Sequence, residues 1–107
     1  MHGKRVLLAA VIVLSMPTAR GSAQEIGQPS RGMELANRLC AQCHNVLKNQ
    51  RQSPNEHAPR FQAIAAVPGM TAIALSAALN TSHRLMPNIV LQADDQADVI
   101  AYILSLK

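Results

Sequence analysis

The chain has 107 residues, a formal net charge of +4, two cysteines, one Phe, one Tyr and no Trp. This length excludes two independently packed domains, because a second hydrophobic core needs a longer chain. Beyond residue 23, seven basic residues face six acidic ones, a balance of about +1 that excludes a charge-driven role with nucleic acid or a membrane surface.

The first 23 residues have the pattern of a cleavable signal peptide. Lys4 and Arg5 form a short positive region, and an apolar stretch follows over residues 6–16. Small residues at 21–23 fit the site that a signal peptidase reads, so we expect an exported, periplasmic protein whose mature domain is 24–107. The apolar stretch is shorter than the ~20 residues that cross a bilayer, which disfavours a stable membrane protein.

The first part of the mature chain predicts helices. Ser30 is a suitable N-cap for a helix over residues 31–43, whose apolar residues fall on one broad side. A short apolar turn or helix is expected over residues 61–67. Thr71 can then cap a helix that ends near residue 80.

Loops and one last helix complete the prediction. Residues 48–60 are polar and contain two prolines, which indicates a loop, and residues 81–88 form a second loop. Asp94 and Asp95 fall in the first turn of a helix that runs through Leu106, where their charges favour the positive end of the helix dipole. No stretch alternates as a strand does, so the predicted class is all-α.

The segment Cys40-Ala41-Gln42-Cys43-His44 has the spacing that attaches haem c. Two cysteines three positions apart lie on nearly the same side of a helical turn, where both thiols reach the two vinyl groups of one haem edge. The histidine that follows is placed beneath the iron. We therefore expect one haem c attached through two thioethers, with Cys40 and Cys43 binding the cofactor and His44 the metal.

Two other sites use a similar motif. A redox disulfide of the thioredoxin kind normally opens the helix after a strand, and no strand pattern precedes Cys40. A zinc site needs a fourth ligand, and the remaining histidines show no paired spacing to supply it. The small aromatic content agrees with a large cofactor, because a chain this short needs additional buried surface to fold stably.

Four elements in this order resemble the small class I cytochromes c of bacteria, over Gly32 to Leu106. These elements are the helix that enters the Cys40–His44 motif, a Pro59-x-Phe61 turn, Met86-Pro87, and a C-terminal helix with Tyr102-Ile103-Leu104-Ser105-Leu106. The resemblance implies a class I cytochrome c fold, with three main helices and loops wrapped around one covalently bound haem.

The resemblance also implies a role for particular residues. His44 is the proximal and Met86 the distal iron ligand, while the carbonyl of Pro59 accepts the other ring N–H of His44. The small residues at Gly32 and Ala36 are expected where the last helix crosses the first, with Tyr102 as the packing aromatic. The chain lacks the Trp that holds a haem propionate in relatives, which leaves four candidates for that role: Arg60, Asn80, Ser82 and His83.

The distal ligand has competitors. Met33 is interpreted as core filler, whereas Met70 is either core or a ligand. His83 lies three residues before Met86 on the same loop and would give bis-histidine ligation. Met86 is favoured because Pro87 stiffens the chain and has no N–H to donate.

With both axial positions filled by protein, no open site is left for oxygen or substrate. The expected function is a periplasmic one-electron carrier, not an enzyme, that exchanges electrons with redox partner proteins. One alternative is a dedicated cytochrome subunit of a periplasmic dehydrogenase, with its apolar surface covered by a stable partner. Another is a gas-binding or sensor cytochrome in which Met86 is labile.

Overall fold

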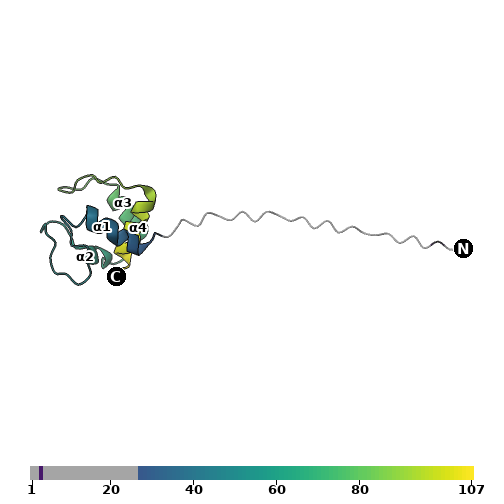
Figure 1. Cartoon of the computed structure of the whole chain (residues 1–107), viewed down its shortest axis with the longest axis horizontal. Helices are drawn as coiled ribbons and strands as arrows, with labels where there is room; N and C mark the ends of the chain where they lie inside the picture. The colour runs from purple at the N-terminus through teal and green to yellow at the C-terminus, as the bar shows by residue number, and fades with distance from the viewer. Residues whose placement is uncertain (1–2, 4–26) are drawn as a thin grey trace.

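The computed structural model describes residue 3 and residues 27–107, so the predicted signal peptide (1–23) lies outside the described residues except for residue 3 (Figure 1). The described part contains no strand, and its helices are α1 (Pro29–Leu39), α2 (Phe61–Ala65), α3 (Ala72–Leu79) and α4 (Ala93–Leu104). The prediction of an all-α fold is confirmed.

Helices α1 and α4 pack against each other at the centre of the fold (Figure 1). A Cβ atom added to Gly32 would overlap the backbone carbonyl of Asp98 and come 2.8 Å from Cβ of Tyr102. Ala36, one turn later, has no exposed surface. Small residues on α1 therefore allow the two backbones to approach closely, as the resemblance implies.

The start of α1 differs from the prediction. The helix begins at Pro29, and its cap residue is Gln28, whose side chain makes no capping hydrogen bond. Instead, the Gln28 backbone N–H donates to Oδ1 of Asp98 at 2.6 Å, and the Arg31 Nε lies 3.2 Å from the second carboxylate oxygen. Ser30 is therefore not the N-cap. Proline suits the first turn because a backbone N–H there has no partner within the helix.

The end of α1 also differs. The helix ends at Leu39 and does not continue to Cys43. The backbone N–H groups of Cys40 and Ala41 both donate to the carbonyl of Ala36, which interrupts the regular helical ladder. The motif then forms a separate turn in which the His44 N–H donates to the Cys40 carbonyl at 2.9 Å.

Met33 is not the core filler that the sequence suggested. It is 40% exposed, because α1 buries a different stripe of residues: Gly32, Leu35 and Ala36. The buried core includes the single Phe and the single Tyr of the chain, and its apolar members are Leu35, Ala36, Val46, Phe61, Ala65, Leu75, Val99, Ile100, Tyr102, Ile103 and Leu106.

The starts of α3 and α4 agree with the sequence. Oγ1 of Thr71 accepts the backbone N–H of Ala74 at 3.2 Å, so the predicted cap is present. Asp94 and Asp95 lie in the first turn of α4, while Gln92 at its cap makes no side-chain bond. Both α2 and α4 are shorter than predicted, because turns follow their last helical residues.

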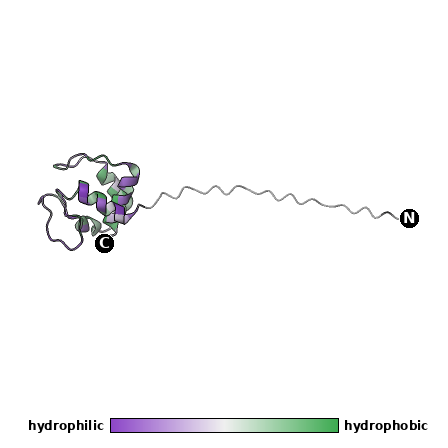
Figure 2. Cartoon of the chain, viewed as in Figure 1, coloured by the Kyte–Doolittle hydropathy of each residue, from purple (hydrophilic) through white to green (hydrophobic). Residues whose placement is uncertain are grey.

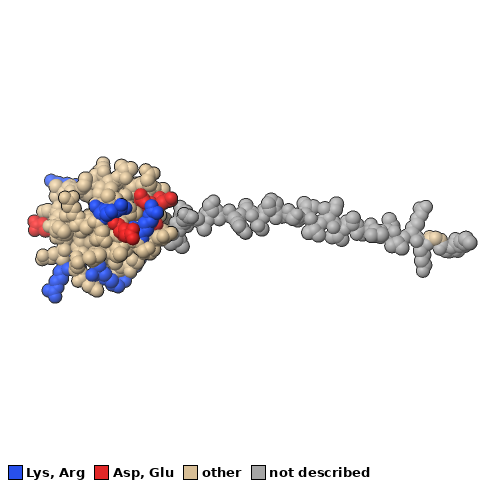
Figure 3. All heavy atoms as spheres, in the orientation of Figure 1, with Lys and Arg blue, Asp and Glu red and all other residues tan. Residues whose placement is uncertain are grey.

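Hydropathy and charge differ among the helices. Figure 2 shows α3 as hydrophobic and α1 as largely hydrophilic. On the face seen in Figure 3, charged side chains of both signs form one mixed cluster and the others stand apart, so no patch of a single sign is seen. Near the start of α1, Arg31 lies 3.1 Å from Asp95. Within the described residues, no helix has both the length and the apolar character needed to cross a bilayer.

Candidate functional site

A largely apolar pocket of about 280 Å³ lies between α3 and the two long loops, which both project to one side of the helical core (Figure 1). All five predicted site residues line it, although they come from segments far apart in the chain. The main lining residues are Leu39, Cys40, Cys43, His44, Pro59, Phe61, Ile64, Leu75, Leu79, His83, Leu85, Met86, Ile89 and Ile103.

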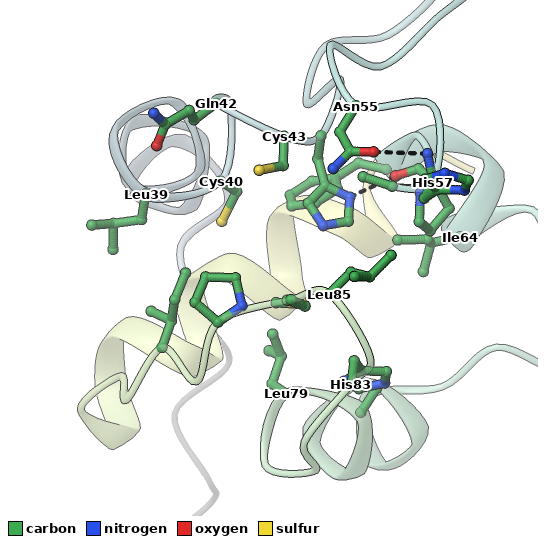
Figure 4. A pocket seen from close by; sticks show the side chains of 18 of the residues that line it. Leu39, Cys40, Gln42, Cys43, Asn55, His57, Ile64, Leu79, His83 and Leu85 are labelled. Carbon is green, nitrogen blue, oxygen red and sulfur yellow. Dashed lines mark hydrogen bonds between the residues drawn. The ribbon is translucent and has the colours of Figure 1, made fainter.

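The two cysteines lie on the same side of this pocket, opposite Leu79 and His83 (Figure 4). Both thiols are free, and burial raises the pKa of Cys40 above its ordinary value. Apolar surroundings of this kind suit an uncharged sulfur such as a thioether.

Zinc binding, one of the alternatives for this motif, would need a group of ligands that the described part of the chain does not bring together. No group of three or more His, Cys, Asp or Glu side chains gathers as a metal site anywhere in the described residues. Cys40, Cys43 and His44 instead line a cavity whose other walls are mainly aliphatic and aromatic. A flat, largely apolar cofactor fits this lining better than a hydrated cation does.

His44 is held by a hydrogen bond to the backbone. Its Nδ1 lies 2.7 Å from the carbonyl oxygen of Pro59. A carbonyl only accepts, so Nδ1 carries the ring proton and Nε2 keeps its lone pair free for a metal. The contact expected from the resemblance is thus present.

Phe61 supports the same ring from the side. The ring centroids of His44 and Phe61 are 5.4 Å apart with an interplanar angle of 53°, a tilted arrangement that aromatic pairs favour. Phe61 itself is buried as the first residue of α2. Pro59 and Phe61 therefore fix the histidine from two directions.

The candidate distal ligands differ in their position relative to the pocket. Met86 and His83 line the pocket, whereas Met70 packs against the core outside the pocket lining. The carbonyl of Met70 accepts a hydrogen bond from Nζ of Lys107 at 2.9 Å. Met86 is half-buried, and its backbone N–H donates to the His83 carbonyl at 3.2 Å. The geometry therefore leaves Met86 and His83 as candidates and removes Met70.

The four candidates for binding a haem propionate also differ in their position relative to the pocket. The Arg60 guanidinium donates to the Gln50 carbonyl at 2.7 Å, and the Asn80 side chain donates to the carbonyl of Ser76. Of the four, His83 alone lines the pocket. His83 thus competes for two roles, as a metal ligand and as a propionate partner.

Some lining residues were missed at the sequence level. Leu85 lies in the segment over residues 81–88 that was interpreted as a loop, Ile89 follows directly after it, and both line the pocket. The sequence feature that could have identified them is the unusually apolar composition around Met86. Leu85 adopts φ = 70°, a backbone conformation in which leucine is rare, next to the candidate ligand.

Comparison with known proteins gives one curated relative. The chain is 31% identical over 96 residues to cytochrome c-552 of Bradyrhizobium diazoefficiens, and the match covers 90% of each chain. No model of a protein family matches the chain, and no solved structure does.

Proposed function

The chain belongs to the small class I cytochromes c, and from that premise we propose that it is an exported one-electron carrier with His44 and Met86 as axial iron ligands. A haem-based electron carrier with covalent haem c follows from the family. Export and the ligand pair are the proposal. The pattern of residues 1–23 supports export, and the single observation that carries the haem site is the bond from His44 to Pro59 beside paired thiols in an apolar pocket.

Each residue has a distinct task in holding the group. Cys40 and Cys43 provide the two thioethers, which fix the haem edge to the turn after α1. His44 presents Nε2 to the metal because Pro59 occupies Nδ1–H, and that bond also increases the electron density on the ring. Met86 presents a soft thioether from the opposite segment, and Pro87 lines the pocket beside it.

The bound haem supplies a metal that changes its oxidation state by one electron without forming or breaking a substrate bond. His44 and Met86 would hold the metal, and apolar side chains, notably Leu75, Leu79 and Ile103, would surround the group. Ligands held in place by the protein would rearrange little when the charge of the metal changes. Redox partner proteins then deliver and remove the electron.

A specific observation also favours the alternative of a dehydrogenase subunit. Helix α3 is apolar on all sides but has only Leu75 fully buried, and Ile73 is 83% exposed. Val90, in the loop before α4, is 89% exposed. A stable partner covering these side chains would bury apolar surface that water now contacts.

One experiment separates these functions. The exported, haem-loaded protein is purified, and its mass in solution and its visible spectrum are recorded in both oxidation states, with and without carbon monoxide. A carrier is monomeric, low-spin and unchanged by carbon monoxide. A co-purified dehydrogenase would support the subunit function, and a high-spin spectrum that responds to the gas would support a sensor.

A further inference from the structure

We propose that Asn45 and Ser53 are positioning residues that hold the Pro59 carbonyl against His44 and so tune the electron density of the proximal ligand. This inference rests on the proposed function, in which His44 binds the haem iron. Neither Asn45 nor Ser53 lines the haem pocket, so both act through other residues.

Asn45 joins the motif to the middle and to the end of the loop that carries Pro59. It follows His44 directly and is only 3% exposed. Its backbone carbonyl accepts the N–H of Phe61 at 2.9 Å, and its backbone N–H donates to Oγ of Ser53 at 3.0 Å. Since Phe61 lies two residues after Pro59, the first bond fixes the end of the loop where the histidine's acceptor sits.

The Asn45 side chain fixes the direction of the backbone where the chain leaves the motif and enters this loop. Its Oδ1 accepts the backbone N–H of Leu47 at 3.0 Å, which forms a local turn of the kind that asparagine favours. This bond fixes the amide orientation, because only the oxygen can accept. Nδ2 therefore points away from Leu47 and is buried without a hydrogen-bond partner among the described residues.

Serine at position 45 would therefore provide a useful comparison. Its hydroxyl can accept the same N–H more weakly, and it would not bury an unpaired amide donor. Alanine would remove the acceptor of the Leu47 N–H but keep the two backbone bonds of residue 45 to Phe61 and Ser53, so it tests the side-chain turn alone. The loop is also tied to the motif by the backbone N–H of Asn55, which donates to the Cys43 carbonyl at 3.1 Å, so the side chains of Asn45 and Ser53 act beside a backbone bond that no side-chain substitution removes.

The consequence for the metal follows from the hydrogen bond of His44. A well-aligned bond from Nδ1–H to a carbonyl raises the basicity of the ring and favours the oxidised metal. If the loop shifts, the Pro59 oxygen moves away from 2.7 Å and the ring donates less electron density. The reduced form is then favoured, so the midpoint potential rises.

The test uses the full, haem-loaded protein and its variants Asn45→Ala, Ser53→Ala and Asn45→Ser. The midpoint potential is measured together with hydrogen exchange of the His44 Nδ1–H by NMR. Both alanine variants should raise the potential and speed exchange roughly two- to tenfold, as expected when one neutral hydrogen bond is weakened. Asn45→Ser should stay near the wild type.

Thr71→Ala is the matched control, because it also removes one side-chain acceptor of a backbone N–H, far along the chain from this loop. It should lower stability and change neither readout. Alanine variants that behave like Thr71→Ala would overturn the positioning role, and Ser53→Ala decides alone if Asn45→Ala does not accumulate. An absorption spectrum unchanged by His44→Ala would overturn the proposed function and the positioning role together.

Discussion

The backbone N–H of Gln28 donates to the carboxylate of Asp98 at 2.6 Å, which joins the start of α1 to the middle of α4. Asp98 is 7% exposed, and its other oxygen lies 3.2 Å from Nε of Arg31. The buried carboxylate of Asp98 thus accepts a hydrogen bond at the start of α1 and also pairs with the Arg31 guanidinium. Its removal would leave the Gln28 N–H without its acceptor, while Arg31 would keep its contact with Asp95.

Asp98→Ala should lower the free energy of unfolding of the haem-loaded protein by about 1–3 kcal/mol, because it removes the charged acceptor of a buried helix-start N–H. Guanidinium denaturation followed by haem absorbance measures this. Asp94→Ala is the control: Asp94 is exposed in the same helix, and its loss should cost about 0.3–1 kcal/mol through the helix dipole. Equal losses in the two variants would contradict the anchoring role of Asp98.

Gly32→Ala tests the close approach of α1 and α4. Alanine is better than glycine in a helix interior by about 1 kcal/mol, so propensity alone predicts a more stable protein. The added Cβ would instead overlap the Asp98 carbonyl, and overpacking of this kind costs about 1–3 kcal/mol or more. We expect the steric cost to exceed the gain, and thermal unfolding checks the sign. A raised Tm would show that the helices can separate without loss.

Local signals in the sequence were sufficient for the starts of α3 and α4, whereas the helix predicted over residues 31–43 ends at Leu39, before the motif turn. Thr71 and Asp94 were placed correctly because capping and dipole effects depend on neighbours within one turn. The start of α1 was wrong because its N-terminal donor is satisfied by Asp98, which is 70 positions away. No local pattern reports such a partner.

The site residues show the same difference between what local sequence predicts and what depends on distant contacts. The thiol pair and His44 are adjacent in sequence, so their common orientation could be predicted from helical spacing. The contact to Pro59 came from the family resemblance. Asn45 was missed because its bonds run across a loop whose path depends on tertiary contacts, including the Tyr102 hydroxyl on the Val46 carbonyl.

Tyr102→Phe should change the alkaline stability of the protein. Burial raises the pKa of Tyr102 above its ordinary value of 10.0, so the unfolded chain loses this proton first as the pH rises. The stabilisation is complete below about pH 10 and is lost as the pH rises further. The wild type should therefore lose stability more steeply than Tyr102→Phe above pH 10, although the variant lacks the Val46 bond and starts about 1 kcal/mol lower. Parallel curves from denaturation at several pH values would contradict this.

The double variant Cys40→Ala, Cys43→Ala should contain no covalently attached haem. Each single variant keeps one sulfur on the pocket wall and should mature in low yield. Haem staining of the exported protein after denaturing electrophoresis measures attachment directly. Met33→Ala is a suitable control, since Met33 is exposed on α1 and should mature normally. Wild-type levels of attached haem in the double variant would refute thioether formation at these residues.

The assignment of Met86 as distal ligand is tested most directly by the weak near-infrared sulfur-to-iron band of the oxidised protein. The band should be present in the wild type and absent in Met86→Ala, whose potential should also fall because a soft donor that favours Fe(II) is lost. Met70→Ala and His83→Ala should retain it, because Met70 lies outside the pocket lining and His83 contributes no sulfur. Retention of the band in Met86→Ala, or its loss in Met70→Ala, would contradict the proposed pair of His44 and Met86.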